Sequence, residues 1–375
     1  MGTTIKEKQV TALNIFLIFF GTIVGAGFAS GREIYVYFAR FGISGLVITF
    51  FAGILFYFLG YVFLQLGKRC KVKNLSHFFK LIFGRFAPIV EIIVIFSYII
   101  VLGAMFAGFD SLQHIVSKDL NYPILAILSA LFCVFVVLGG ISKISKINGF
   151  LLPILLLFML AIFVFSLKNC SLNCFKNLSV IDTYTVVYSL ISGLIFVCSN
   201  MFLTGFVLMQ VGFNSTRKTN KIASFITGLV IFLVSFFACL TIIANPDSIQ
   251  YDMPFVYLAF GISDFFIILS VIILWFAIFT TAVATMLTIS WWLNGYINNN
   301  LLSTTITCVV SFLLSRVGFS IIIDTFYPIT GLMDIIFVMC ALFLYFKNSK
   351  NKTKITNDRV LYNKKIKISI NYLEE

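Results

Sequence analysis

The sequence predicts an all-α membrane protein that crosses the bilayer ten times. Of its 375 residues, 60% are hydrophobic and 11% are charged, whereas about 25% of the residues of a soluble domain are charged. Charge-free stretches of about 20 residues or more recur along the chain, and this is the length that a transmembrane helix needs. The period-two alternation of a membrane β-barrel is absent, and helices satisfy every backbone amide within lipid.

The expected helices follow the charge-free stretches in order. The run at 265–315 must hold two helices, because Asn294, Gly295 and the three asparagines at 298–300 interrupt it. Two further spans, near 88–114 and 319–346, tolerate internal carboxylates. The expected spans are 9–40, 43–67, 87–116, 121–140, 147–167, 182–211, 221–245, 263–295, 301–316 and 319–346.

The basic residues predict the orientation in the membrane. Ten crossings put most of the 27 lysines and arginines on one side, including the cluster between Lys68 and Arg85 and the tail from Lys347. Basic loops face the cytoplasm, so we expect a multi-pass protein of the cell membrane with both termini cytoplasmic. Residues 1–346 form the expected transmembrane domain, and 347–375 form a basic cytoplasmic tail. The net charge of +13 therefore needs no nucleic-acid partner; the expected surroundings are the lipid bilayer.

The ten spans divide into two halves of five, at about 8–167 and about 182–346. The first span of each half is unusual: the first contains Gly21, Gly25, Gly27 and Gly31, and the sixth contains Ser189, Ser192, Gly193, Ser199, Asn200, Thr204 and Gly205. An odd number of helices makes the halves enter the membrane in opposite directions, and paired interruptions are a feature of inverted-repeat transporters. The pattern predicts a 5+5 inverted repeat with discontinuous helices 1 and 6.

The densest glycine motif runs from Gly21 to Glu33. If the helix unwinds at Gly25, Ala26 and Gly27, the freed amides and the positive end of the following half-helix suit a substrate carboxylate. Phe28 directly follows this segment. The alternative is an intact helix whose glycines form small-xxx-small packing pairs. Four glycines followed by a charged pair favour unwinding.

This stretch resembles the first helix of a known family. Gly25-Ala26-Gly27-Phe28 is similar to the glycine-bracketed unwound segment of the amino acid-polyamine-organocation superfamily, and Ala29-Ser30-Gly31-Arg32-Glu33 resembles its continuation in the YkvI-like family of amino-acid permeases. The organisation matches over about 8–346, but the motif covers only the first helix. The resemblance implies a leucine-transporter-like 5+5 fold and an amino-acid substrate.

The sixth span supplies a second candidate substrate site. The polar groups of Ser199, Asn200 and Thr204 suit a substrate amine or carboxylate, with Phe196 and Phe202 nearby as candidate gates. Small polar residues also form interhelical hydrogen bonds worth about 0.6 kcal/mol on average. The residues leave both interpretations open.

The eighth span carries a candidate ion site. Thr280 and Thr281 lie side by side, and freed carbonyls in the first span would complete a set of oxygen ligands for sodium, from Gly21, Thr22 and Val24. In sodium-coupled relatives of the resembled fold, an adjacent hydroxyl pair on helix eight supplies such a site. Ordinary threonine packing is the alternative.

Proton coupling competes with sodium coupling. Some proton-coupled members of the superfamily carry a lysine within helix five, and residues 147–167 contain none. We therefore favour sodium as the coupling ion and expect no other cofactor or metal.

Charged residues inside a membrane span are functional candidates by default. Arg32 and Glu33 lie toward the outer end of the first span, and Asp324 lies toward the outer end of the tenth. We hypothesise that Arg32 and Asp324 approach each other as an external gate. Asp334 lies deeper and follows Pro328, which suggests a kinked helix around a polar cavity.

The expected function is secondary transport of an amino acid or a related small solute, not enzymatic catalysis. No nucleophile, metal-ligand or paired-carboxylate motif occurs in a suitable context. The alternatives are a non-transporting sensor of the same fold, like the membrane subunit of a spore germinant receptor, and a channel. Cys170 and Cys174 lie in a predicted outer loop, where free thiols are favoured over a disulfide. The sequence leaves the substrate and the oligomeric state open.

Overall fold

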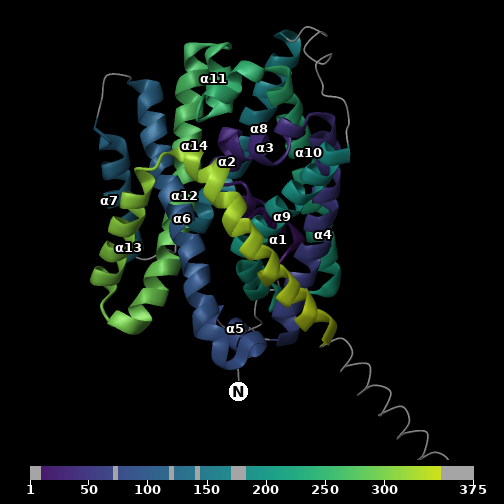
Figure 1. Ribbon diagram of the computed structural model, residues 1–375, viewed down its shortest axis with the longest axis vertical. Coiled ribbons are helices and arrows are strands. Elements are labelled where there is room, and N and C mark those ends of the chain that lie inside the picture. The colour runs from purple at the N-terminus through teal and green to yellow at the C-terminus, as the bar shows by residue number, and fades with distance from the viewer. Residues whose placement is uncertain (1–9, 71–74, 118–121, 140–143, 170–182, 348–375) are drawn as a thin grey trace, which may run out of the picture.

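The computed structural model describes residues 10–70, 75–117, 122–139, 144–169 and 183–347, and the regular elements in these ranges are helices (Figure 1). Six of them are long and apolar enough to cross a membrane, and four shorter apolar helices accompany them in this part of the chain. Together they match the ten expected spans in order. Cys170, Cys174 and the tail beyond Lys347 lie outside the described residues.

Spans two to nine are formed by single helices, with short elements between some of them. The span helices are α4 (Ile43–Cys70), α6 (Ala87–Val116), α7 (Ile124–Gly139), α8 (Ile144–Asn169), α9 (Thr183–Gly212), α10 (Arg217–Ala244), α12 (Asp264–Ile297) and α13 (Asn300–Ser315). The connecting elements are α5 (Leu75–Phe83), η2 (Gly84–Phe86), η4 (Pro246–Gln250) and α11 (Pro254–Phe260). In Figure 1, α5 lies at the bottom of the bundle and α11 at the top.

The first span is discontinuous, as the glycine motif predicts. Helix α1 (Ala12–Ile23) ends where Val24 and Gly25 leave the helical conformation, with ψ angles of 76° and −167°. Helix α2 (Ala26–Ser30) then begins. The helix therefore breaks at Val24 and Gly25, and Gly27 belongs to the short helix that follows.

A second turn follows six residues after the first. Gly31 has a φ of 86°, a left-handed conformation that glycine adopts without the penalty of a side chain. It ends α2 and starts α3 (Arg32–Tyr37), which is followed by η1 (Ala39–Phe41). The direction of the chain therefore changes immediately before the charged pair of the motif.

The sixth span is one unbroken helix, α9. The interruption predicted for helix 6 is therefore wrong. The Asn200 side chain bonds to its own helix, since its Nδ2 donates to the Phe196 carbonyl at 3.0 Å. Its glycines allow close packing: a Cβ on Gly205 would lie 2.4 Å from Cε1 of Phe63 in α4. Small residues at helix contacts serve this purpose in membrane bundles.

The irregular span of the second half is the tenth. It begins with α14 (Phe319–Ile321), passes through one π-helical stretch, η5 (Ile322–Phe326), and continues as a helix to Lys347. A π-helical stretch widens the turn and occurs frequently at functional sites. Element η5 packs against α3 and α6, so the irregular parts of spans one and ten lie together.

The helix contacts repeat when the two halves are exchanged, which fits a 5+5 inverted repeat. The first span packs on the seventh (α1 on α10), and the sixth packs on the second (α9 on α4). Likewise the third packs on the ninth (α6 on α13), and the eighth packs on the fourth (α12 on α7). Each contact has its counterpart five spans later, and inverted transporter repeats are built in this way.

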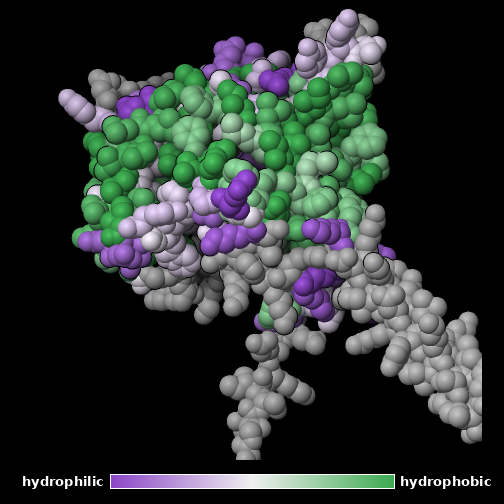
Figure 2. All heavy atoms as spheres, turned by 60° about the horizontal axis from the view of Figure 1, so that its bottom comes forward, coloured by the Kyte–Doolittle hydropathy of each residue, from purple (hydrophilic) through white to green (hydrophobic). Residues whose placement is uncertain are grey.

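The basic residues at the end of α4 contact other spans at one end of the bundle. Lys68 at the end of α4 donates to the Ser215 carbonyl at 2.8 Å, just before α10. Arg69 donates to the Tyr345 carbonyl at 3.3 Å and stacks over the Tyr345 ring. Figure 2 shows hydrophobic side chains across the visible face of the molecule, with hydrophilic side chains gathered above and below them. The sequence prediction of a multi-pass membrane protein is confirmed.

The contact between α4 and α9 requires glycine at one position. A Cβ on Gly67 would lie 1.7 Å from the backbone carbonyl of Met209, so Gly67→Ala must separate the two helices. We expect this overpacking to destabilise the protein by about 1–3 kcal/mol, measured as a lower thermal unfolding midpoint in detergent.

Gly295 in α12 is the matched control, since a Cβ there meets nothing within 4 Å. Gly295→Ala should instead stabilise the helix by about 0.5–1 kcal/mol. Equal midpoints for the two variants would contradict the close approach of α4 and α9.

Candidate functional site

The break in the first span leaves backbone groups without partners. Val24 N–H donates to the Phe20 carbonyl and Gly25 N–H donates to the Ile23 carbonyl. Within the described part of the chain, the carbonyls of Gly21, Thr22 and Val24 accept no hydrogen bond. The first amides of α2 have no side-chain cap either. The broken helix therefore offers three carbonyl oxygens and several N–H groups.

Thr281 of α12 faces this break. A Cβ on Gly25 would lie 3.5 Å from Thr281 Oγ1. The hydroxyls of Thr280 and Thr281 both donate to the Ala277 carbonyl, at 3.2 and 3.0 Å, so the lone pairs of both oxygens remain available. The fold thus brings one of the two candidate ion-binding threonines next to the broken helix.

A small cavity lies between α3, α6, α9 and span ten. Its volume is about 30 Å³, enough for about two water molecules and too small for an amino acid without movement. Two carboxylates face it, Glu33 from α3 and Asp334 from span ten, together with Ser199 and Asn200 from α9. The remaining lining residues are Tyr37, Ser97, Val101, Phe202, Leu203, Tyr327 and Thr330.

Glu33 reaches the cavity because Gly27 leaves room for it. A Cβ on Gly27 would lie 2.1 Å from Glu33 Oε1, so the carboxyl occupies the space that any larger residue at position 27 would fill. Glu33 is 8% exposed. The left-handed turn at Gly31 folds α3 back toward α2 and makes this contact possible.

Asp334 enters the cavity from the opposite side. It is 4% exposed, and its carboxyl lies beside the Ser199 hydroxyl. A Cβ on Gly331, one turn earlier, would lie 2.5 Å from Ser199 Oγ, so span ten and α9 are in close contact here. The expectation that Asp334 lies at a polar cavity is met.

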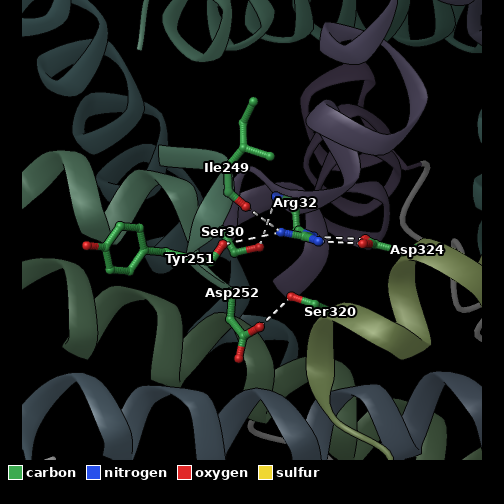
Figure 3. Close-up of polar contacts among 7 residues, drawn as sticks. All are labelled: Ser30, Arg32, Ile249, Tyr251, Asp252, Ser320 and Asp324. Atoms are coloured by element: carbon green, nitrogen blue, oxygen red, sulfur yellow. Dashed lines mark hydrogen bonds and ion pairs between the residues drawn. The ribbon is translucent and has the colours of Figure 1, made fainter. Parts of the chain in front are cut away.

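Arg32, next to Glu33 in sequence, points away from the cavity toward the α11 end. Its guanidinium forms a two-pronged ion pair with Asp324, in which Nε donates to Oδ1 at 2.8 Å and Nη2 pairs with Oδ2 (Figure 3). Its Nη1 also donates to the carbonyls of Ile249 and Tyr251, at 3.0 and 3.3 Å. The hypothesised approach of Arg32 and Asp324 is present in the structure.

A second polar contact lies beside this ion pair. Asp252, between η4 and α11, accepts hydrogen bonds from Ser320 in span ten and from Ser111 in α6, the latter at 2.7 Å (Figure 3 shows the Ser320 contact). Spans one, three and ten are therefore tied to the η4–α11 segment by side chains.

Aromatic residues cover the cavity on the α5 side. Phe202 lines the cavity, and its ring contacts Tyr98 and Phe337 at centroid distances of 5.3 and 5.2 Å. Phe337 in turn contacts Phe63 of α4 and Phe78 of α5. These aromatic contacts join α4, α5, α6, α9 and span ten next to the cavity.

The predicted substrate residues divide into two groups. Ser199 and Asn200 line the cavity, whereas Thr204 is fully buried outside it with a hydroxyl that has no partner in the described chain. In the first span, Gly25 faces Thr281. The backbone from Ala26 to Phe28 continues from there, and the Phe28 ring stacks on Phe196 at 6.3 Å.

Sequence reasoning missed the position of Glu33. It lies beside Arg32 in the sequence and was grouped with it near the outer end, but the two side chains point to different places. The available signal was the spacing of Gly27, Gly31 and Glu33, since a left-handed glycine reverses the direction of the chain over this distance. Phe196, a candidate gate, is 0% exposed and packs in the core.

Comparisons with known proteins identify relatives along most of the chain. No protein-family model matches it. It is 22% identical over 346 residues to the uncharacterized membrane protein YkvI of Bacillus subtilis, which covers 90% of this chain and 97% of YkvI. It is 26% identical over 334 residues to the uncharacterized protein YyaD of the same organism, covering 87% of this chain and 94% of YyaD.

Solved structures share its fold. The structure of MhsT in complex with L-phenylalanine superposes with a TM-score of 0.64 at 14% identity, covering 88% of this chain and 90% of MhsT. A mutant of the manganese transporter of Eremococcus coleocola superposes with a TM-score of 0.60 at 13% identity, covering 88% and 78%. The second of these structures is that of a transporter. The YkvI resemblance of the first helix is therefore confirmed over nearly the whole chain, and the chain has a leucine-transporter-like fold.

Proposed function

We propose that this protein is a secondary active transporter that carries an amino acid or a related small solute across the cell membrane by alternating access. The observation that carries the proposal is the cavity between Glu33 and Asp334, whose Glu33 carboxyl packs against Gly27 in the short helix that follows the break. Such a site can open to one side of the membrane at a time. The shared fold of solved transporters supports this function.

We propose sodium as the coupling ion. The free carbonyls of Gly21, Thr22 and Val24 and the hydroxyl of Thr281 are neutral oxygen ligands. Unwound carbonyls coordinate sodium in transporters with broken helices. Thr280 is buried on the adjacent position of α12 and adds a second hydroxyl.

We propose that the solute contacts both the unbroken helix α9 and the broken first span. Ser199 and Asn200 line the cavity, and the backbone at Gly25, Ala26, Gly27 and Phe28 lies at the break beside it. The basic end of the bundle, with Lys68 and Arg69, faces the cytoplasm under the positive-inside rule. This orientation puts the Arg32–Asp324 pair on the external side as a gate.

Reconstituted proteoliposomes should take up a labelled amino acid when a sodium gradient is imposed, and Thr281→Ala should weaken the dependence on sodium. The variant removes one oxygen ligand at the break, so we expect the sodium affinity to fall by about tenfold, the equivalent of about 1.4 kcal/mol. The measurement is the initial uptake rate as a function of sodium concentration.

Two variants on α12 serve as controls. Thr281→Ser keeps the hydroxyl and should keep the sodium dependence. Thr288→Ala should also leave it unchanged, since Thr288 Oγ1 donates only to the Ala284 carbonyl of its own helix. Amino-acid binding without uptake or exchange would point to a sensor instead of a transporter. Uptake that ignores sodium and follows a proton gradient would overturn the sodium assignment alone.

A further inference from the structure

The cavity contains two carboxylates and no basic side chain. Glu33 and Asp334 are both more than nine-tenths buried, and the lining includes no lysine, arginine or histidine. The adjacent Arg32 is engaged by Asp324 and by two backbone carbonyls. A charged side chain within the membrane costs a few kcal/mol unless it is paired or hydrated. This cost is removed when the carboxyls are protonated or when a positively charged partner binds between them.

An unpartnered hydroxyl faces the same space. Tyr37 is 2% exposed and lines the cavity, and its hydroxyl has no hydrogen-bond partner in the described chain. Buried polar groups are normally hydrogen-bonded, so this hydroxyl is a second, independent indication that a ligand binds here.

The lining suits an ammonium group better than a metal ion. Asn200 Nδ2 donates to the Phe196 carbonyl, which leaves its Oδ1 as an acceptor. The cavity also exposes the aromatic side chains of Tyr37, Phe202 and Tyr327, and aromatic faces attract organic cations. No group of three acidic, histidine or cysteine side chains suited to a metal occurs among the described residues.

We propose that the cavity binds the ammonium group of the transported solute between the carboxylates of Glu33 and Asp334, and that it therefore prefers amines with a net positive charge. One ammonium group leaves one negative charge in the lining, so a second positive group on the solute adds attraction, and a carboxylate on the solute is repelled. Basic amino acids and short diamines are the expected class. This inference rests on the proposed transport function and names its substrate class.

The test uses the purified full-length protein in detergent and four probes of graded charge: 1,4-diaminobutane, L-lysine, L-leucine and L-glutamate. Thermal unfolding midpoints are measured over a range of probe concentrations to obtain dissociation constants. We expect L-lysine and 1,4-diaminobutane to bind at least about tenfold more tightly than L-leucine, since each makes one further charge-assisted contact. Stronger binding of L-glutamate or L-leucine, or no binding of either cationic probe, would overturn the proposal.

Glu33→Gln and Asp334→Asn keep the shape of each side chain and remove its charge. Each should weaken the binding of L-lysine at least about tenfold, because one charge-assisted contact is lost. The ligand-free variants should unfold at the same temperature as the unmodified protein or higher, since a neutral amide costs less to bury than a carboxylate. A purely structural role predicts lower unfolding temperatures and unchanged binding.

Asp264→Asn is the matched control, because Asp264 is an exposed carboxylate at the start of α12 and lies outside the cavity lining. It should leave the binding of L-lysine unchanged. Binding of L-lysine without uptake would leave this inference standing and remove the transport function. Uptake of a solute without an ammonium group would remove this inference and leave the transport function standing.

Discussion

Arg32→Ala should open the cavity toward the α11 end and make it accessible to reagents in the solvent. The variant removes both prongs of the pair with Asp324 and the two hydrogen bonds to the Ile249 and Tyr251 carbonyls, all of which hold the closed arrangement. Because Asp324 is 34% exposed, solvent screening reduces the value of the pair. We expect the equilibrium between the closed and open forms to shift toward the open form by about 1–2 kcal/mol, or roughly tenfold.

The measurement is the rate at which a maleimide modifies a cysteine introduced at Ser97, which lines the cavity and is 4% exposed. The modification rate of the protein that keeps Ser97 is subtracted, since native cysteines such as Cys133 and Cys198 also react. Arg32→Ala should raise the corrected rate roughly tenfold. Arg32→Lys should give an intermediate rate, because a lysine keeps the charge but cannot form the two-pronged contact.

The control is a second ion pair at the protein surface. Arg316 pairs with Asp110 at 3.3 Å, and the Arg316 side chain is 48% exposed. Asp110→Asn breaks this exposed pair and should leave the modification rate unchanged. If both variants accelerate modification equally, the effect is a general loosening of the bundle and the gate assignment is wrong.

Gly27→Ala should abolish most of the transport activity although it adds only one methyl group. The added Cβ would lie 2.1 Å from Glu33 Oε1, so the carboxyl must leave the cavity. We expect a destabilisation of about 1–3 kcal/mol from overpacking and a loss of uptake of at least about tenfold. Helix propensity alone predicts that the substitution stabilises the protein, since alanine in a helix is favoured over glycine by about 0.5–1 kcal/mol.

A double-mutant cycle isolates the contact between Gly27 and Glu33. In a Glu33→Ala background the methyl group has room, so Gly27→Ala should become nearly neutral for the free energy of unfolding. The expected coupling energy is about 1–3 kcal/mol, which is typical of residues in direct contact. Additive effects of the two substitutions would show that Gly27 serves some purpose other than housing the carboxyl.

Much of the fold follows from local sequence. The ten spans were predictable because each needs only a stretch of apolar residues, and burial in lipid depends on the side chains within that stretch. The break at Gly25 was predictable for a related reason, since glycines within one or two turns weaken a helix locally. The sixth helix shows the limit of this reasoning. Its glycines pack against α4, and Asn200 bonds to its own helix, so the same residue types give an unbroken helix.

The candidate site depended more on contacts between distant segments. The sequence supported the Arg32–Asp324 pair because opposite charges in membrane spans seek each other, although the two residues are 292 positions apart. It did not reveal that Glu33 and Asp334 line one cavity. That depends on the left-handed turn at Gly31, the space beside Gly27 and the approach of span ten to α9.

The sequence by itself therefore determined the membrane class, the number of spans, the interrupted first helix and the residues able to carry charge within the bilayer. Only the tertiary structure decided which of those charges are paired and which line a cavity. The reason is physical. The choice between lipid and water is made by each segment from its own side chains, whereas the compensation of a buried charge depends on groups that the folded chain brings from other spans.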